Sequence, residues 1–297
     1  MRTAVSKLLD GMVDMHCHPG PNPLPRVFDH YQAARDAGRL NMRAILVKSH
    51  HHNTVMDVLS FGALLDEVST SVYGGVALNC QVGGINPYVV EMSLRMGGKA
   101  VWFPTISSAP HIRHLKEGGR FPQATIELSE QVVDIRGEDG ELLPEVDRVL
   151  DLVLESGAFV SGGHMSFDDI RSLFEAARAK GIKRMVLNHP GSKSMLFTYD
   201  QVRELIALGA YVEQVVAQFD PGAPKSMYTP ADLMAWIEVT GPERTVLASD
   251  LGQLGRALPV DAFLRTAEAL LDLGLPEADL RRMTCTNPAY LLALDEL

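Results

Sequence analysis

Residues 166–189 read SFDDIRSLFEAARAKGIKRMVLNH, and this stretch contains one complete helix-plus-strand unit. Apolar residues recur three and four positions apart in its first part, which predicts an amphipathic helix that ends near Gly181. The apolar run that follows predicts a buried strand, and His189 comes directly after it. The stretch therefore predicts a strand of a parallel sheet with a histidine at its carboxyl end.

The same alternation of short apolar runs and amphipathic segments repeats along the chain. Eight predicted strands cover residues 11–16, 42–48, 71–79, 99–105, 158–163, 183–189, 210–215 and 244–250. Eight such units favour a closed barrel over an open doubly wound sheet. We therefore predict an α/β protein with a single (β/α)8 TIM barrel domain over residues 1–297.

One connection is unusually long and follows the fourth predicted strand, over about residues 106–143. Within it the segments QATIEL (123–128) and EQVVDI (130–135), followed by the turn Asp139-Gly140, predict a small hairpin inserted in the barrel. Long loops of this kind usually cover the active face of a barrel.

Four of the ten histidines and one aspartate lie at or just after the carboxyl ends of predicted strands. His16 and His18 follow the first strand, His164 the fifth and His189 the sixth, and Asp250 ends the eighth. Residues i and i+2 of a strand face the same side, so two imidazoles can reach one ion from a single strand. The eighth strand neighbours the first in a closed barrel. These five residues therefore predict a metal site at the end of the barrel where such enzymes build their active sites.

The composition indicates a globular protein that acts on a small molecule. The chain has 297 residues, 46% of them hydrophobic, and a formal net charge of −10. This charge opposes attraction to nucleic acid or to an anionic membrane surface, and no apolar run is long enough to span a bilayer. The N-terminal stretch has too short an apolar run for a signal peptide, so we expect a cytoplasmic protein. Three widely spaced cysteines predict neither a disulfide framework nor a metal knuckle. A homo-oligomer is expected only from the general frequency of homo-oligomers.

Several motifs resemble those of the amidohydrolase superfamily of metal-dependent hydrolases. They are DMHCHPGP (14–21), His164, NHPG (188–191), ASD (248–250) and the closing TNPAYLLAL (286–294). The resemblance implies that His16, His18 and Asp250 hold a first divalent metal ion, Zn²⁺ in our expectation. It implies that His164 and His189 hold a second ion, or contact substrate and water in one-metal members.

One departure from the family concerns the fourth strand, where many members have a bridging carboxylate or carboxylated lysine. The run KAVWFPT offers only Trp102 and Thr105 near its end, which favours one metal ion. The second strand ends in VKSHHHNT, where Lys48 and His50 share a side if the strand continues. Three roles are open for Lys48: an unusual bridging ligand, a partner for a substrate carboxylate, or a residue at the rim of the barrel. His50 is a candidate substrate-binding residue.

The roles of three further residues are left open. His111 and His114 in the long connection are either lid contacts to the substrate or solvated residues. Glu213, inside the seventh strand, is either an acceptor behind the metal ligands or a polar residue that points to the helices. Cys17 is expected in the core.

The expected chemistry is hydrolysis by a metal-activated water that attacks an amide, cyclic amide, lactone or ester carbonyl. Asp250 would act as general base and His189 would stabilise the developing oxyanion, with Lys48 as a third catalytic candidate. The main alternative is a zinc-dependent decarboxylase or hydratase acting on an unsaturated carboxylic acid. Two others are a phosphoesterase and a barrel that binds metal or small ligands without catalysis.

Overall fold

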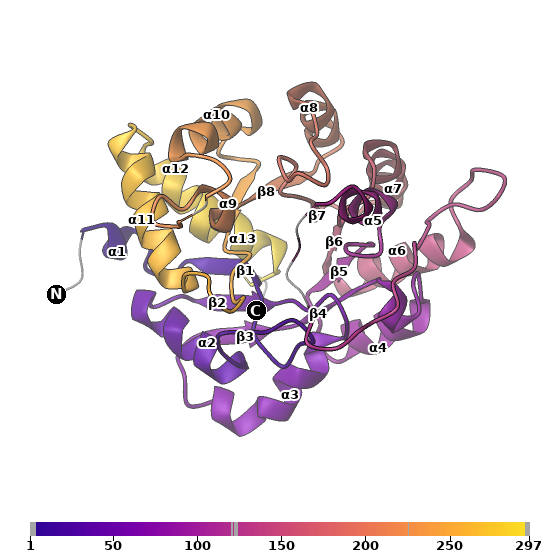
Figure 1. The fold of residues 1–297 in the computed structure, drawn as a ribbon, viewed down its shortest axis with the longest axis horizontal. Helices are drawn as coiled ribbons and strands as arrows, with labels where there is room; N and C mark the ends of the chain where they lie inside the picture. The colour runs from indigo at the N-terminus through magenta and orange to yellow at the C-terminus, as the bar shows by residue number, and fades with distance from the viewer. Residues whose placement is uncertain (1–3, 120, 122–123, 225, 295–297) are drawn as a thin grey trace.

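The strands are parallel and follow one another around a barrel that helices surround (Figure 1). The computed structural model describes residues 4–119, 121, 124–224 and 226–294. The strands are β1 (Val13–Cys17), β2 (Ala44–Val47), β3 (Ser71–Tyr73), β4 (Gly75–Ala77), β5 (Ala100–Trp102), β6 (Phe159–Ser161), β7 (Met185–Asn188), β8 (Tyr211–Val215) and β9 (Thr245–Ala248). They lie within the eight predicted ranges, apart from Cys17 at the end of β1.

Gly74 divides the third predicted strand into β3 and β4. β3 pairs with β2, whereas β4 pairs with β5, so the strand changes partner at this residue. A Cβ atom at position 74 would lie 2.6 Å from the backbone nitrogen of Val55. Only glycine therefore fits where the chain passes this close to the first turn of the helix Thr54–Leu65.

The first and last strands join through backbone hydrogen bonds at their carboxyl ends. Asp250 N donates to His16 O at 2.7 Å, and His18 N donates to Leu251 O at 2.8 Å. The carboxylate of Asp14 accepts a further bond from Ser249 N at 2.9 Å. These contacts close the ring, and the predicted barrel is confirmed.

Most helices cover the outside of the strands, and α13 lies at one end of the barrel. Their bounds are α1 (Ala4–Leu8), α2 (His30–Ala37), α3 (Thr54–Leu65), α4 (Pro87–Arg95), α5 (Ala109–Lys116), α6 (Pro144–Ser156), α7 (Phe167–Lys180), α8 (Tyr199–Ala207), α9 (Val216–Phe219), α10 (Pro230–Thr240), α11 (Pro259–Asp272), α12 (Glu277–Arg281) and α13 (Asn287–Leu291). In α7 the side chain of Ser166 accepts from Asp169 N, and Gly181 ends the helix with φ of 94°. No helix in the described part of the chain is long and apolar enough to cross a membrane.

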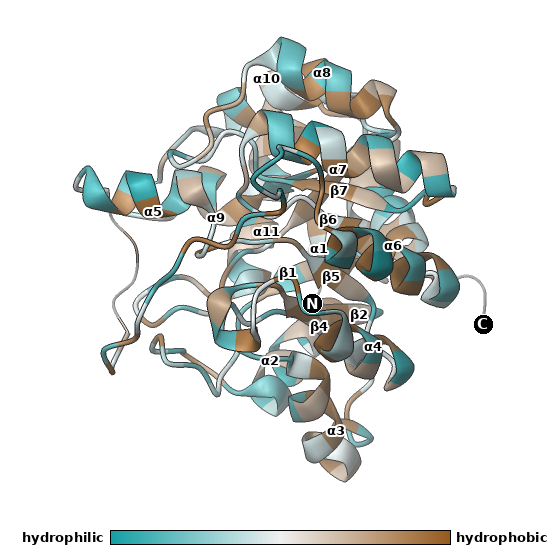
Figure 2. Cartoon of the chain, turned by 90° about the vertical axis from the view of Figure 1, so that its right-hand side faces the viewer, coloured by the Kyte–Doolittle hydropathy of each residue, from teal (hydrophilic) through white to brown (hydrophobic). Residues whose placement is uncertain are grey.

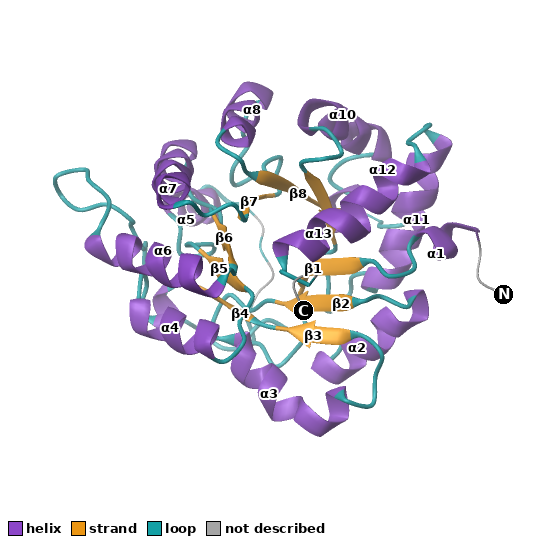
Figure 3. Cartoon of the chain, turned by 180° about the vertical axis from the view of Figure 1, so that it is seen from behind, coloured by secondary structure: helices purple, strands orange, loops and turns teal. Residues whose placement is uncertain are grey.

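The buried apolar side chains form two groups. The larger one fills the space between the strands and the surrounding helices. The smaller one fills the barrel interior, where Met15, Trp102 and Phe159 pack with Leu291 and Leu292 at the carboxyl end of α13. Figure 3 shows α13 on the face of the barrel turned toward the viewer, opposite the face seen in Figure 1. These apolar side chains close one end of the barrel, and the polar residues lie at the other end.

The insertion after β5 differs from its prediction. It begins with α5, which stands apart from α6 and α7 in Figure 2. The described residues of QATIEL and EQVVDI form no strands, and Ile126 is 57% exposed, so these segments lack the burial that would pair them. Only the turn at Asp139-Gly140 is confirmed, closed by a single antiparallel bridge between Arg136 and Leu142. The segment instead crosses to the loop after β1, where Thr125 N donates to Pro23 O at 2.8 Å.

Candidate metal centre

The two histidines of the β1 motif have fixed ring orientations. His18 Nδ1 lies 2.8 Å from the carbonyl oxygen of Lys48, which can only accept, so Nδ1 carries the proton. His16 Nδ1 lies 2.8 Å from Glu213 Oε1, which also accepts from Asn188 Nδ2 at 2.7 Å. Both Nδ1 atoms therefore donate, and both Nε2 atoms present a lone pair. Metal-ligating histidines are oriented in this way.

The two Nε2 lone pairs converge with a carboxylate oxygen. The Nε2 atoms of His16 and His18 are 3.1 Å apart, and Asp250 Oδ1 lies 3.1 Å from His18 Nε2 and 3.5 Å from His16 Nε2. Ligands of a tetrahedral zinc ion are separated by about 3.4 Å, given metal–ligand bonds of about 2.0–2.1 Å. Three acceptors at this spacing repel one another unless a cation lies among them. The residues present therefore fit a divalent metal ion.

A second group of candidate ligands shares His16. His16, His189 and Glu213 also place one ligand atom each within 4.8 Å of one another. Glu213 Oε1, however, already accepts the bonds from His16 and Asn188. This favours the group of His16, His18 and Asp250 as the ligand set, with Glu213 as its support.

The backbone at two of these residues adopts an uncommon conformation. Asp250 has φ of 53° and His189 has φ of 23°, both in the left-handed region that side chains with a Cβ atom rarely occupy. Such residues gather at functional sites, where the surrounding structure maintains a strained geometry. His189 follows β7 directly and Asp250 lies two residues after the end of β9, so both lie at the carboxyl end of the barrel.

Three further histidines, His111, His164 and His189, lie beside the ligand group of His16, His18 and Asp250. Together with Lys48 and His50, these residues are called the cluster. The ring of His164 lies 5.0 Å from that of His189 and 5.5 Å from that of His111, between ring centroids. Neither ring nitrogen of His164 or His111, nor Nδ1 of His189, has a hydrogen-bond partner in the described part of the chain. His111 belongs to α5, so the insertion contributes to the site, whereas His114 packs against Gly119.

Lys48 and His50 both lie inside the cluster. Lys48 is fully buried, and its Nζ lies 3.2 Å from His16 Nε2 and 5.1 Å from the ring centroid of Trp102. Of the three alternatives for Lys48, the rim position is therefore wrong. His50 Nδ1 lies 2.9 Å from Thr105 Oγ1, and its ring centroid lies 5.1 Å from that of His18.

Burial keeps the imidazoles of the cluster neutral. It lowers the pKa of His16 to about 3, and it lowers the pKa values of His18, His164 and His189 below the usual range. Neutral imidazole is the form that binds metal. Burial also lowers the pKa of Lys48, to about 8, and raises the pKa of Glu213.

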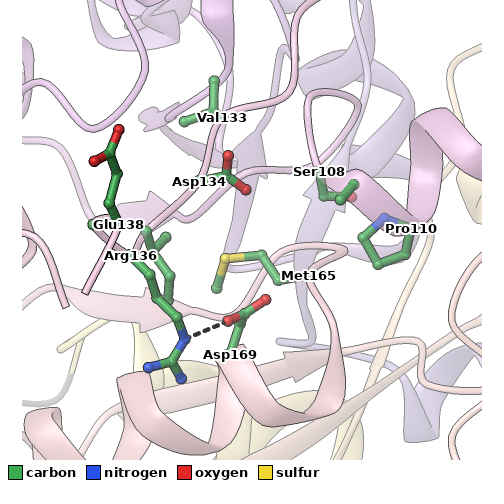
Figure 4. A pocket seen from close by; sticks show the side chains of 11 residues that line it. Ser108, Pro110, Val133, Asp134, Arg136, Glu138, Met165 and Asp169 are labelled. Atoms are coloured by element: carbon green, nitrogen blue, oxygen red, sulfur yellow. Dashed lines mark hydrogen bonds and ion pairs between the residues drawn. The ribbon is translucent and has the colours of Figure 1, made fainter. Parts of the chain in front are cut away.

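A separate cavity of about 340 Å³ lies behind His164, away from the converging ligand atoms. Its lining includes Met165, which follows His164, and Ser108, whose hydroxyl donates to His164 O at 2.8 Å. On its other side Arg136 Nε donates to Asp169 Oδ1 at 2.9 Å (Figure 4). The cavity therefore adjoins the backbone of the site.

Of the two alternatives for Glu213, the contacts favour the acceptor behind the metal ligands. Its carboxylate faces the barrel interior and orients His16, while Cys17, as expected, is buried in the core. The only sequence signal was an acidic residue within an otherwise largely apolar strand. No sequence pattern indicated a role for Arg26, in the loop after β1.

Three similar solved structures have names that refer to hydrolases or a lactonase. An amidohydrolase from Pseudomonas aeruginosa has 12% identity and a TM-score of 0.66, with 98% of each chain covered. An organophosphorus hydrolase from Deinococcus radiodurans has 13% identity and a TM-score of 0.56, with 98% of this chain and 94% of that one covered. A lactonase template engineered for organophosphate hydrolysis has 14% identity and a TM-score of 0.55, with 98% of each chain covered. The expected likeness to the amidohydrolase superfamily is confirmed as a likeness of fold.

Comparison with curated proteins finds no match. Residues 11–213 match a family described as a family of unknown function (DUF6282). The matched range contains His16, His18, His164, His189 and Glu213 and ends before Asp250. It covers more than half of the chain, and the chain therefore belongs to the DUF6282 family.

Proposed function

We propose that this protein is a hydrolase that uses one divalent ion, Zn²⁺ by its ligand types, held by His16, His18 and Asp250. The observation that carries the proposal is the convergence of two oriented Nε2 lone pairs and one carboxylate oxygen at separations of 3.1–3.5 Å. Nitrogen and oxygen ligands in this number leave a position open, as catalytic zinc sites do. The hydrolytic names of the structural relatives support this reading over the decarboxylase or hydratase alternative.

The chemistry that a divalent ion supplies is the activation of water near neutral pH and the polarisation of a substrate carbonyl. We assign Asp250 as the general base, because its side chain is 26% exposed and faces the open end of the barrel. Asp250 would take the proton of the attacking water on the carboxylate oxygen that faces away from His18, and return it to the leaving nitrogen or oxygen.

Four side chains are assigned to the substrate. The unpartnered ring nitrogens of His189 and His164 support a role in holding the carbonyl oxygen as it gains negative charge. Lys48 Nζ, beside His16, is assigned as a further hydrogen-bond donor to that oxygen. His50 is assigned to substrate binding, since Thr105 orients its ring. His164 and His189 would also be the ligands of a second ion, if one binds.

We also propose that the protein acts on a small molecule in the cytoplasm. All three cysteines are free, which supports a reducing compartment.

The test is a panel of amides, cyclic amides, lactones and esters, assayed with the zinc-loaded protein and after chelation. We expect hydrolysis that chelation abolishes, that zinc restores, and that Asp250→Asn lowers by at least 100-fold. Product analysis by mass spectrometry separates the addition of water from loss of carbon dioxide. Decarboxylation, or turnover that chelation leaves unchanged, would overturn the proposal.

A further inference from the structure

Arg26 is a partly buried cation in a loop beside the metal centre, and the proposed chemistry does not use it. It lies in the loop between β1 and α2 and pairs with Gln253 in an antiparallel bridge. Two neighbouring bonds, Val27 N to Gly252 O at 2.9 Å and Leu254 N to Pro25 O at 3.1 Å, tie the same two loops together. The position of Arg26 is therefore fixed beside the segment that carries Asp250.

The guanidinium of Arg26 is buried at two nitrogens that have no acceptor. Its Nε and Nη2 atoms are inaccessible to solvent and donate to no group in the described part of the chain. A buried donor without an acceptor costs free energy that folding does not recover. Native proteins keep few groups of this kind, and each calls for a partner from outside the chain or for a functional role.

Backbone contacts place Arg26 beside the site. Gly252, which accepts the bond from Val27 N, lies directly against the carbonyl group of His18. Asp250 attracts Arg26, yet Asp250 Oδ1 is the oxygen that contacts His18. In the described part of the chain, neither Nε nor Nη2 of Arg26 therefore has a carboxylate partner.

The chain itself shows what the Nε and Nη2 edge of an arginine binds. Arg265 uses these two atoms to hold the carboxylate of Asp220, with Nε to Oδ1 at 2.8 Å and Nη2 to Oδ2 at 2.6 Å. The two N–H groups on this edge are parallel and match the two oxygens of a carboxylate. Arg26 presents the same edge without an acceptor from any residue that the structure describes.

We propose that Arg26 binds a carboxylate of the substrate through Nε and Nη2, so that the enzyme selects small molecules that carry a free carboxylate near the hydrolysed bond. This inference rests on the proposed hydrolase function and names its substrate class. A neutral substrate of the same shape is disfavoured, because it leaves the buried guanidinium unpaired.

The test measures binding of glutarate to the zinc-loaded protein by calorimetry, with glutaramide as the neutral analogue and inorganic phosphate as a second anion. The zinc-free protein is measured in parallel, because a carboxylate can also bind the metal directly. We expect glutarate to bind both forms, glutaramide to bind neither, and Arg26→Met to weaken glutarate binding by about 10- to 100-fold. Arg26→Lys keeps the charge but loses the paired donors, and we expect it to bind at least threefold more weakly than wild type.

Two controls separate binding from folding. Arg203→Met removes an exposed arginine and should leave glutarate affinity unchanged. Arg26→Met should be at least as resistant to thermal unfolding as wild type, because it removes two buried donors that have no acceptor in the described part of the chain. If Arg26→Met fails to fold, the glutarate affinity of Arg26→Lys tests the proposal instead.

The outcomes also distinguish this inference from the proposed function. Glutarate binding that depends on Arg26, without hydrolysis of any substrate, would retain the carboxylate site and refute the hydrolase. Hydrolysis by the wild type, with glutarate affinity unchanged in the Arg26 variants, would retain the hydrolase and refute the carboxylate site. Preference for phosphate over glutarate would overturn the carboxylate assignment.

Discussion

Glu213→Gln replaces the carboxylate that orients His16 by a neutral amide of nearly the same size. The carboxylate lies 2.8 Å from His16 Nδ1 and is also bonded to Asn188 Nδ2 at 2.7 Å. An amide oxygen can still accept from both groups, so the change removes charge and leaves the geometry in place. It therefore isolates the electrostatic support that Glu213 gives to His16 as a ligand.

The expected loss of zinc affinity is 10- to 100-fold, the usual effect of removing the group behind a metal-ligating histidine. This range corresponds to about 1.4–2.7 kcal/mol. With zinc well above its dissociation constant, the zinc-bound protein loses the same free energy of unfolding. For a chain of this length that lowers Tm by about 2–5 °C.

The metal-free protein should respond differently to the same change. Burial raises the pKa of Glu213, so the charged carboxylate is less favourable in the folded protein than in the unfolded chain. Replacing it with a neutral amide removes this cost at pH 7. The metal-free variant should therefore be no less stable than the metal-free wild type.

The assay is competition for zinc with a chromophoric chelator, together with thermal unfolding with and without zinc. Glu204→Gln is the matched control, because it removes one negative charge from a side chain that is 49% exposed. A change in zinc affinity below threefold, or an equal loss of stability with and without zinc, would refute the assignment of Glu213.

Three further outcomes follow from the structure. Burial lowers the pKa of Lys48 to about 8 from 10.5, so between these pH values the unfolded chain binds more protons than the folded protein. Urea unfolding of the metal-free wild type should therefore show a free energy of unfolding that rises with pH across this window. The variant Lys48→Met should not show this rise. Gly252→Ala would place a Cβ atom 2.1 Å from His18 O at φ of +130°, so urea unfolding should show a loss of about 3 kcal/mol or more, against about 1 kcal/mol for Gly255→Ala, where no atom lies within 4 Å. His50→Ala should raise KM about tenfold with kcat nearly unchanged in steady-state assays; a fall in kcat alone would contradict its assignment to substrate binding.

The barrel and the residues at its open end were predictable from the sequence. Parallel strands end at the same side of a barrel, so a histidine after the apolar run 185–187 and an aspartate after 245–248 meet without any knowledge of the loops. That His16 and His18 face the same side follows from the two-residue period of a strand alone.

Other parts of the site depend on contacts that no local pattern encodes. In the strand AYVEQV, apolar residues lie on both faces, so alternation does not show which way Glu213 points. The turn residues of the insertion predict a hairpin, but the described residues of the two segments before the turn form no strands. Arg26 acquires its position from two loops that are more than 200 residues apart in the chain.

The central claim is that His16, His18 and Asp250 bind a divalent ion, and the most direct test is the metal content of the purified protein after reconstitution with zinc and removal of excess. Elemental analysis should give about one ion per wild-type chain, none for His16→Ala or Asp250→Asn, and an unchanged value for His114→Ala, whose ring lies outside the ligand set. Two ions per chain would assign His164 and His189 to a second site and revise the role of Lys48. The absence of bound metal in the wild type, with zinc or with manganese, would contradict the account.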